Sequence, residues 1–448
     1  MNDPIAAVRQ APSGSIATSS TPESYRYYAV WLLSSVYMLN MLDRTLLTPL
    51  IEPIKLEFQL SDTQMGLLGG MAFALFYTTL AMPLARLADH INRVNIVSIS
   101  IAVWSVFTAL TGLATGFWTL LAARIGIGVG EAGCNPASYS IISDYFHAKR
   151  RATALAIFHA GASVGVFIGF LVAGFVLSHY TWRHAFFIVG IPGLILALVV
   201  KLTLREPQRG MSDEHQVAHH VAPPALHVLM ELLRKPAFRN MAIACALNNA
   251  AIFGIGTFIP SYLIRSHEVA ASDASYILAF VHLAGGFFGT FFGGMLSDRL
   301  ANHFQDRRYY LWVPAGFMVL YFPLAQITYG THDVYVAIAG ITLTQICMVV
   351  YLSPCLSALF GMVGLRERAL ASALLLLILN FIGIGLGPYA AGLISDLVNA
   401  SLANQGMDAT QATAEGLRWS LRGMTILGIW AALHYFLSAR RLKQDSLQ

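Results

Sequence analysis

Residues 184–203 read HAFFIVGIPGLILALVVKLT, twenty positions whose only formally charged side chain is Lys201, near the end of the run. A helix of twenty residues is about 30 Å long, which matches the hydrocarbon core of a bilayer. Backbone polar groups in lipid must be satisfied within the segment, so a long apolar run predicts a membrane-spanning helix. This stretch therefore predicts a helix that crosses a membrane.

Apolar runs of similar length recur along the whole chain and are separated by short polar turns. The composition agrees, because 56% of the 448 residues are hydrophobic and only 11% are charged, against about 25% charged residues in a soluble protein. We therefore predict twelve spans, at 27–50, 62–85, 94–115, 118–143, 151–178, 184–203, 238–264, 274–296, 310–330, 332–361, 369–399 and 417–437.

The longest hydrophilic interruption divides these spans into two sets of six. Leu87-Ala88-Asp89 after the second span is echoed by Leu296-Ser297-Asp298-Arg299 after the eighth, which indicates a duplication. We expect an all-α membrane protein of twelve transmembrane helices in two six-helix bundles, with a substrate site between them. The expected organisation is a cytoplasmic tail (1–26), an N-terminal bundle (27–203), a linker with an amphipathic helix (204–237), a C-terminal bundle (238–437) and a second tail (438–448).

The basic residues indicate the orientation of the chain. With the N-terminus inside, most loops rich in Lys and Arg face the cytoplasm, as the positive-inside rule requires. We expect both termini in the cytoplasm and a multi-pass protein of the inner (plasma) membrane. The formal charge of +5 is scattered over short loops, so it predicts topology and no binding of nucleic acid.

Two motifs resemble those of a known family. Residues 85–93, ARLADHINR, resemble the loop signature Gly-x-Leu-Ala-Asp-Arg-x-Gly-Arg of the major facilitator superfamily, with Ala85, His90 and Asn92 departing from it. Residues 124–132, RIGIGVGEA, followed by Pro136, resemble the fourth span of Spinster-like transporters. The resemblance implies the major facilitator fold and transport by alternating access. It further implies lysophospholipid or sphingolipid substrates and, for bacterial members, coupling to protons.

Four charged residues are predicted to lie inside the membrane. Arg124 and Glu131 are seven positions apart on one helix face, about 10 Å along the axis, and Asp43 and Arg44 lie at a similar depth in the first span. Charges at that depth mark ion or substrate paths unless they form a structural salt bridge, which is the alternative here. Our hypothesis is that Asp43 and Glu131 compete for Arg124, so that when one acid is protonated Arg124 forms its ion pair with the other. Arg44, Arg124 and Glu131 are also candidates for substrate binding.

The second half offers neutral polar and apolar candidates for the substrate site. They share predicted spans seven and ten and comprise Asn248, Asn249, Phe253, Thr257, Gln345 and Tyr351. Polar and apolar stripes together suit an amphipathic ligand. The alternative is that individual members only bond one helix to another.

The two loop motifs also predict gating residues, Asp89, Arg93, Asp298 and Arg299. Aspartates and arginines at helix ends can hold two bundles together through ion pairs and helix capping. Such a latch would favour closure on one side of the membrane.

Other function classes find little support. No nucleophile with a neighbouring base occurs within the spans, so we expect neither an enzyme nor a cofactor. His215, His219, His220 and His227 form a histidine-rich stretch, but no acidic or cysteine cluster accompanies them, which favours a linker over a metal site. We expect a monomer in the lipid bilayer that binds protons and an amphipathic organic or lipid substrate. The alternative is a proton symporter for a small hydrophilic organic anion.

Overall fold

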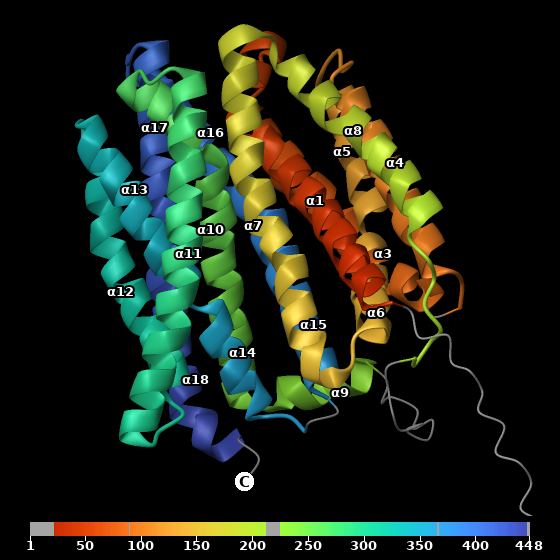
Figure 1. Ribbon diagram of the computed structural model, residues 1–448. Helices are drawn as coiled ribbons and strands as arrows, with labels where there is room; N and C mark the ends of the chain where they lie inside the picture. The colour runs from red at the N-terminus through yellow and green to blue at the C-terminus, as the bar shows by residue number, and fades with distance from the viewer. Residues whose placement is uncertain (1–21, 89, 212–224, 365–366, 446–448) are drawn as a thin grey trace, which may run out of the picture.

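The computed structural model describes residues 22–88, 90–211, 225–364 and 367–445, and all regular elements in these ranges are helical. Two groups of long helices stand side by side (Figure 1). The start of α1 (Glu23–Phe58) and the end of α18 (Ile426–Asp445) lie at one end, here called the termini end. The opposite end, where α1 finishes and α2 (Asp62–Gly66) starts, is called the far end.

The N-bundle contains the first six spans. Its further elements are η1, a π-helical turn (Leu67–Met71), α3 (Ala72–Ala88), α4 (Arg93–Thr111), α5 (Phe117–Glu131), α6 (Cys134–Tyr145), α7 (Ala148–His179) and α8 (Trp182–Thr203).

The C-bundle repeats this plan. Its elements are α10 (Pro236–His267), α11 (Ala271–Phe304), α12 (Tyr309–Gly330), α13 (Val334–Val349), α14 (Leu352–Phe360), α15 (Arg368–Asn380), the π-helical turn η2 (Phe381–Leu386), α16 (Gly387–Asn404), α17 (Ala409–Met424) and α18.

Within the described residues, nine helical segments are long and apolar enough to cross a membrane. Three more segments have the position of a span. These are α1, which carries Asp43 and Arg44 within its length, and the pairs α5–α6 and α17–α18, each of which is divided into two helices. The predicted fold class is confirmed, and the arrangement is consistent with twelve spans. The charged residues of α1 and α5 belong to the site described below.

One short helix, α9 (Ala225–Arg234), lies in the predicted linker and crosses the termini end at a steep angle to the long helices (Figure 1). Val228 and Leu232 are buried, whereas Met230 and Leu233 are exposed. His215, His219 and His220 lie outside the described residues, and no group of three or more metal-ligating side chains occurs within them.

Candidate functional site

Small residues bring α5 against its neighbours and so place its charged side chains. A Cβ on Gly130 would lie 2.6 Å from the backbone nitrogen of Trp104 on α4, and a Cβ on Gly128 would lie 2.7 Å from the carbonyl oxygen of Phe73 on α3. Only glycine permits such close approach. The alternating glycines between Arg124 and Glu131 therefore seat α5 on α3 and α4, with both charges turned into the bundle.

Asp43, Arg44, Arg124 and Glu131 meet inside the N-bundle and are called the central charged cluster. Arg44 Nε donates to Glu131 Oε2 at 2.6 Å, and the Glu131 side chain is fully buried. Thr108 on α4 donates its hydroxyl hydrogen to Asp43 Oδ2 at 2.5 Å. Arg124 Nε donates to the carbonyl oxygen of Leu68 at 3.1 Å. Leu68 belongs to η1, a π-helical turn of a kind often found at functional sites.

Several polar atoms of the central charged cluster make no hydrogen bond in the structure. They include Arg124 Nη1, Asp43 Oδ1 and Glu131 Oε1, all of them buried. An unpaired buried charge in a low-dielectric interior is costly, which is why such groups usually have a ligand, a proton or an ion partner in the working protein. These atoms of the cluster can therefore still bind a ligand or a proton.

Aromatic rings cover the two arginines. The Arg44 guanidinium carbon lies 4.4 Å from the ring centre of Tyr77 and 4.8 Å from that of Phe73. The guanidinium carbon of Arg124 lies 5.5 Å from the Phe73 ring centre. Cation–π contacts of this kind stabilise arginine where water is scarce.

The predicted pairing of these residues needs correction. We expected Asp43 and Glu131 to share Arg124, but Glu131 pairs with Arg44, and no ion pair within 4.0 Å joins Arg124 to an acid among the described residues. The reason is geometric, because Arg44 follows Asp43 directly and so points about 100° around α1 from it, towards α5. The structure does bring all four residues into one cluster.

The candidates from the second half divide into two kinds. Asn248 Nδ2 donates to the carbonyl oxygen of Met348 at 3.1 Å, and Asn249 Nδ2 donates to that of Leu379 at 2.8 Å. The Tyr351 hydroxyl donates to Asn249 Oδ1 at 3.1 Å. Asn248, Asn249 and Tyr351 thus use these polar groups to hold α10 against other helices of the C-bundle.

Thr257 and Phe253 on α10 behave differently. The Thr257 methyl group lies 3.3 Å from where a Cβ on Gly69 of η1 would stand, so this face of α10 meets the N-bundle. Phe253, one turn away on the same face, remains 36% exposed. Gln345 packs its side chain against Gly285 of α11. Phe253 and Thr257 are therefore the candidates of the C-bundle that lie nearest the boundary between the bundles.

The predicted gating residues that the structure describes, Arg93, Asp298 and Arg299, make no ion pair or hydrogen bond to a described residue of the other bundle at the termini end. Arg93 pairs with Asp144, with Glu206 at 2.6 Å and with the Ser140 hydroxyl at 2.7 Å, all in the N-terminal half of the chain. Asp298 accepts a hydrogen bond from Tyr310 at 2.9 Å within the C-bundle, and Arg299 is exposed. Asp89 lies outside the described residues.

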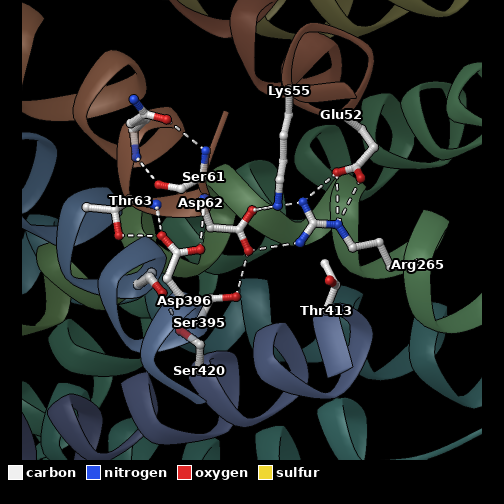
Figure 2. Close-up of polar contacts among 12 residues, drawn as sticks. Glu52, Lys55, Ser61, Asp62, Thr63, Arg265, Ser395, Asp396, Thr413 and Ser420 are labelled. Carbon is white, nitrogen blue, oxygen red and sulfur yellow. Dashed lines mark hydrogen bonds and ion pairs between the residues drawn. The ribbon is translucent and has the colours of Figure 1, made fainter. Parts of the chain in front are cut away.

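The far end carries a network that the sequence reasoning missed. Arg265 on α10 donates to both carboxylate oxygens of Glu52 on α1, at 2.7 to 3.0 Å, and to both oxygens of Asp62 on α2 at 2.9 Å. Lys55 also donates to Asp62, at 2.5 Å. Figure 2 shows these side chains converging from both bundles. Glu52 and Asp62 are buried and the Arg265 side chain is 6% exposed, so these are charge-assisted bonds of the strong type.

A second part of this network caps a helix across the bundle boundary. Asp396 on α16 accepts hydrogen bonds from the backbone N–H groups of Asp62 and Thr63 at 3.0 and 2.8 Å, and from the Thr63 hydroxyl (Figure 2). A carboxylate at a helix N-terminus satisfies free N–H groups and faces the positive end of the helix dipole. Ser395 donates to Asp62 at 2.6 Å. Together these residues are called the far-end latch; they are Glu52, Lys55, Asp62, Thr63, Arg265, Ser395 and Asp396.

Backbone packing tightens the same boundary. A Cβ on Gly392 of α16 would lie 2.2 Å from the Asp62 carbonyl oxygen, and one on Gly70 of η1 would lie 2.3 Å from the carbonyl oxygen of Ile384 in η2. Among pairs of residues that the structure describes, the ion pairs and side-chain hydrogen bonds between the bundles all belong to the far-end latch. The molecule is therefore latched at the far end.

One signal in the sequence could have revealed this latch. Asp396 falls inside the predicted span 369–399, and an acid in a span marks a functional site by the same rule that singled out Glu131. Its partners are Asp62 and Thr63, more than 330 residues away. A separation of that size leaves no periodicity from which the partner could be identified.

Comparison with known proteins agrees with this architecture. The family model described as Major Facilitator Superfamily matches residues 33–388. A crystal structure of a bacterial homologue of the human lysosomal transporter Spinster, inward-facing and unoccupied, shares 31% identity, with a TM-score of 0.88 over 96% of this chain and 100% of that one.

Two curated relatives extend the comparison. An MFS-type efflux pump of Mycolicibacterium smegmatis is 28% identical over 94% of both proteins. A hexuronate transporter of Bacillus subtilis is 26% identical over 58% of this chain and 62% of its own length.

The family model and the solved structure that match this chain both describe membrane transporters, which are not enzymes. The chain belongs to the Major Facilitator Superfamily, and its likeness to the bacterial Spinster homologue makes it a transporter of Spinster type.

Proposed function

We propose that the chain transports an amphipathic organic or lipid-like anion, of the lysophospholipid or sphingolipid class, and couples that transport to protons by alternating access. The observation that carries the proposal is that Arg124 is buried, with 3% of the residue exposed, while its Nη1 makes no hydrogen bond. It lies beside Asp43, an acid without an ion-pair partner of its own among the described residues. The two groups offer one site for an anion and one for a proton.

Charge balance supports coupling between the two. The central charged cluster contains two acids and two arginines, so its net charge is zero when both acids are ionised and rises by one when an acid takes up a proton. A buried net charge is unfavourable in a low-dielectric site. The protonated cluster would therefore bind an anion more strongly, and the anion would in turn favour protonation. Because Glu131 is held by Arg44, we assign the proton to Asp43.

The surroundings suit a ligand with an apolar part. Phe73 and Tyr77 lie beside the arginines, and Phe253 is partly exposed on the α10 face that meets the N-bundle. A head group at Arg124 and Arg44 would leave a tail among these rings. Asn248, Asn249 and Tyr351 would then act mainly by fixing α10, and Gln345 by packing against α11, whereas Thr257 would border the path.

The far-end latch supports alternating access, because the two bundles can separate there only if charge-assisted bonds are broken. In the proposed cycle Arg93, Asp298 and Arg299, together with Asp89, would take over as the latch at the termini end once the far end opens. We assign the termini end to the cytoplasm, the protein to the inner membrane and the active unit to a monomer.

Transport into proteoliposomes tests the proposal. Labelled lysophospholipids and organic anions would be screened with and without an imposed pH gradient, which identifies a substrate and its coupling. Asp43→Asn should then lower gradient-driven accumulation by about tenfold or more, because a neutral amide takes up no proton, while exchange of labelled for unlabelled substrate continues.

The matched control is Asp273→Asn, which removes an exposed aspartate from the start of α11 and should behave as the wild type. Full gradient-driven accumulation by Asp43→Asn would overturn the assignment of the proton to Asp43. Loss of exchange as well as accumulation would show that Asp43 binds substrate and would equally overturn that assignment.

A second candidate function has one specific observation in its favour. The Bacillus subtilis relative is a hexuronate transporter, and a hexuronate is a small hydrophilic organic anion. A proton symporter for such an anion would use Arg124 in the same way but would need no apolar surface. Competition separates the two, because an excess of lysophospholipid should block flux of the labelled substrate in the first case and leave it unchanged in the second.

A further inference from the structure

A basic pocket lies on the C-bundle at the termini end, away from the central charged cluster. Its volume is about 580 Å³, and it is lined by Pro236, Arg239, Asn240, Leu437, Arg440 and Arg441. These residues come from the first turn of α10 and the last turns of α18. Three arginines around one pocket make a strongly positive surface at the level where lipid head groups lie.

The arginines of this pocket are exposed, and no carboxylate pairs with them among the described residues. Arg441 Nη1 donates to the neutral Gln444 at 3.1 Å. Asp445, at the end of α18, accepts a hydrogen bond from the backbone nitrogen of Ala237 at 2.7 Å and so caps α10. Exposed arginines without acidic partners remain available to a ligand, and their planar donors suit phosphate oxygens.

An apolar groove lies beside the basic pocket, on the part of α18 that precedes Leu437. It lies between α12 and α18, has a volume of about 500 Å³ and includes Val319, Ile429, Leu433 and Phe436. Phe436 connects the two features, because the Arg440 guanidinium carbon lies 4.6 Å from its ring centre. The positions of Arg440 and Phe436 are one helical turn apart, about 6 Å along the axis.

We propose that an anionic diacyl phospholipid of the leaflet at the termini end binds here. Its phosphate would lie among Arg239, Arg440 and Arg441, and one acyl chain would fill the groove along Leu433 and Ile429. Charge complementarity selects an anionic over a zwitterionic head group, because the pocket supplies three positive charges and no ion-paired acid. The contact between Arg440 of the basic pocket and Phe436 of the apolar groove selects a lipid over a soluble phosphate, because a lipid can occupy both features.

The site is distinct from the proposed substrate path. The basic pocket involves the outer sides of α10 and α18 in the C-bundle, whereas the central charged cluster is built from α1 and α5 in the N-bundle. The lipid is therefore a bound component of the protein and not its cargo, and the proposal does not depend on which substrate is carried.

Native mass spectrometry and thermal unfolding of the full-length protein in detergent test the proposal. Dioleoyl phosphatidylglycerol should remain bound and raise the melting temperature, whereas dioleoyl phosphatidylcholine and inorganic phosphate should not. Arg239→Gln/Arg440→Gln should weaken phosphatidylglycerol binding at least fivefold. The matched control, Arg86→Gln/Arg205→Gln, removes two exposed arginines from the N-terminal half and should bind the lipid as the wild type does.

Further variants separate the other outcomes. Arg124→Ala should leave this binding unchanged, and its loss there would place the lipid in the central charged cluster and overturn the proposal. Stabilisation by inorganic phosphate equal to that by the lipid would overturn the choice of a lipid. Unchanged phosphatidylglycerol binding in the arginine variant would overturn the site itself. If that double variant fails to fold, Arg440→Gln and Phe436→Ala are measured singly, and each should reduce lipid binding.

Discussion

At the scale of single residues, the pairing of Glu131 with Arg44 explains how an acid can stay buried in this bundle. Glu131 has no exposed surface, and its Oε2 lies 2.6 Å from Arg44 Nε. Removing one member of a buried ion pair leaves a charge without compensation, which costs about 3–5 kcal/mol, although the intact pair adds little net stability. The arginine therefore acts mainly to make an ionised Glu131 tolerable.

A double-mutant cycle measures this dependence. We expect Arg44→Ala to lower the free energy of unfolding by about 3–5 kcal/mol, and we expect Arg44→Ala/Glu131→Ala to recover part of that loss because no unpaired acid remains. Thermal or denaturant unfolding in detergent provides the measurement. Additive losses in the double variant would mean that the two side chains are not coupled.

At the scale of elements, the glycines of α5 determine where its charges stand. A Cβ on Gly130 would meet the Trp104 backbone at 2.6 Å, whereas a Cβ on Gly286 of α11 would meet nothing within 4 Å. Backbone cannot move as a flexible side chain can, so a methyl group at Gly130 must push α5 away from α4. The same push would displace Glu131, the neighbouring residue.

Two alanine substitutions test this role of α5. Gly130→Ala should destabilise the protein by about 1–3 kcal/mol through overpacking and should reduce transport more than expression. Gly286→Ala should be neutral or stabilising by up to about 1 kcal/mol, because alanine favours the helix. Equal melting temperatures for the two variants would show that α5 can shift without strain.

At the scale of the whole molecule, the far-end latch decides which end of the protein is closed. Arg265 bridges Glu52 and Asp62, and Asp396 caps α2 across the boundary. The two π-helical turns, η1 and η2, pack against each other at the same boundary. Because bonds between the bundles concentrate here, this end should control the balance between conformations.

Arg265→Gln should open the far end. Losing the guanidinium leaves Glu52 and Asp62 buried as neighbouring acids, a penalty of about 3–5 kcal/mol on the latched conformation. A cysteine is introduced by Thr257→Cys, and a membrane-impermeant maleimide is added on the side of the membrane that the far end faces. We expect the Arg265→Gln variant to be labelled at least tenfold faster than the protein that retains Arg265.

The control for this labelling experiment is Arg183→Gln. Arg183 pairs with Glu57 at 2.7 Å at the same end, but both residues belong to the N-bundle. Labelling should therefore stay at the wild-type rate in this control. Equal rates in the two variants would contradict the role of the far-end latch.

Much of the fold was predictable from the sequence, because the cost of leaving backbone groups unpaired in lipid acts on each apolar run separately. The division into two bundles was predicted for a similar reason, since two copies of a short motif can be compared without knowing where they lie in space. Buried charges in α1 and α5 were equally visible, because any charge within an apolar run is exceptional wherever it points.

Only the tertiary structure decided which charges meet. Arg44 pairs with a residue 87 positions away, and Arg265 with residues more than 200 positions away. A side chain's partner depends on helix rotation, on local breaks such as η1 and on the seating of two bundles against each other, none of which leaves a repeat in the sequence. Hydrophobic runs report the local solvent of each segment, whereas ion pairs report distances between segments, and those distances exist only in the folded chain.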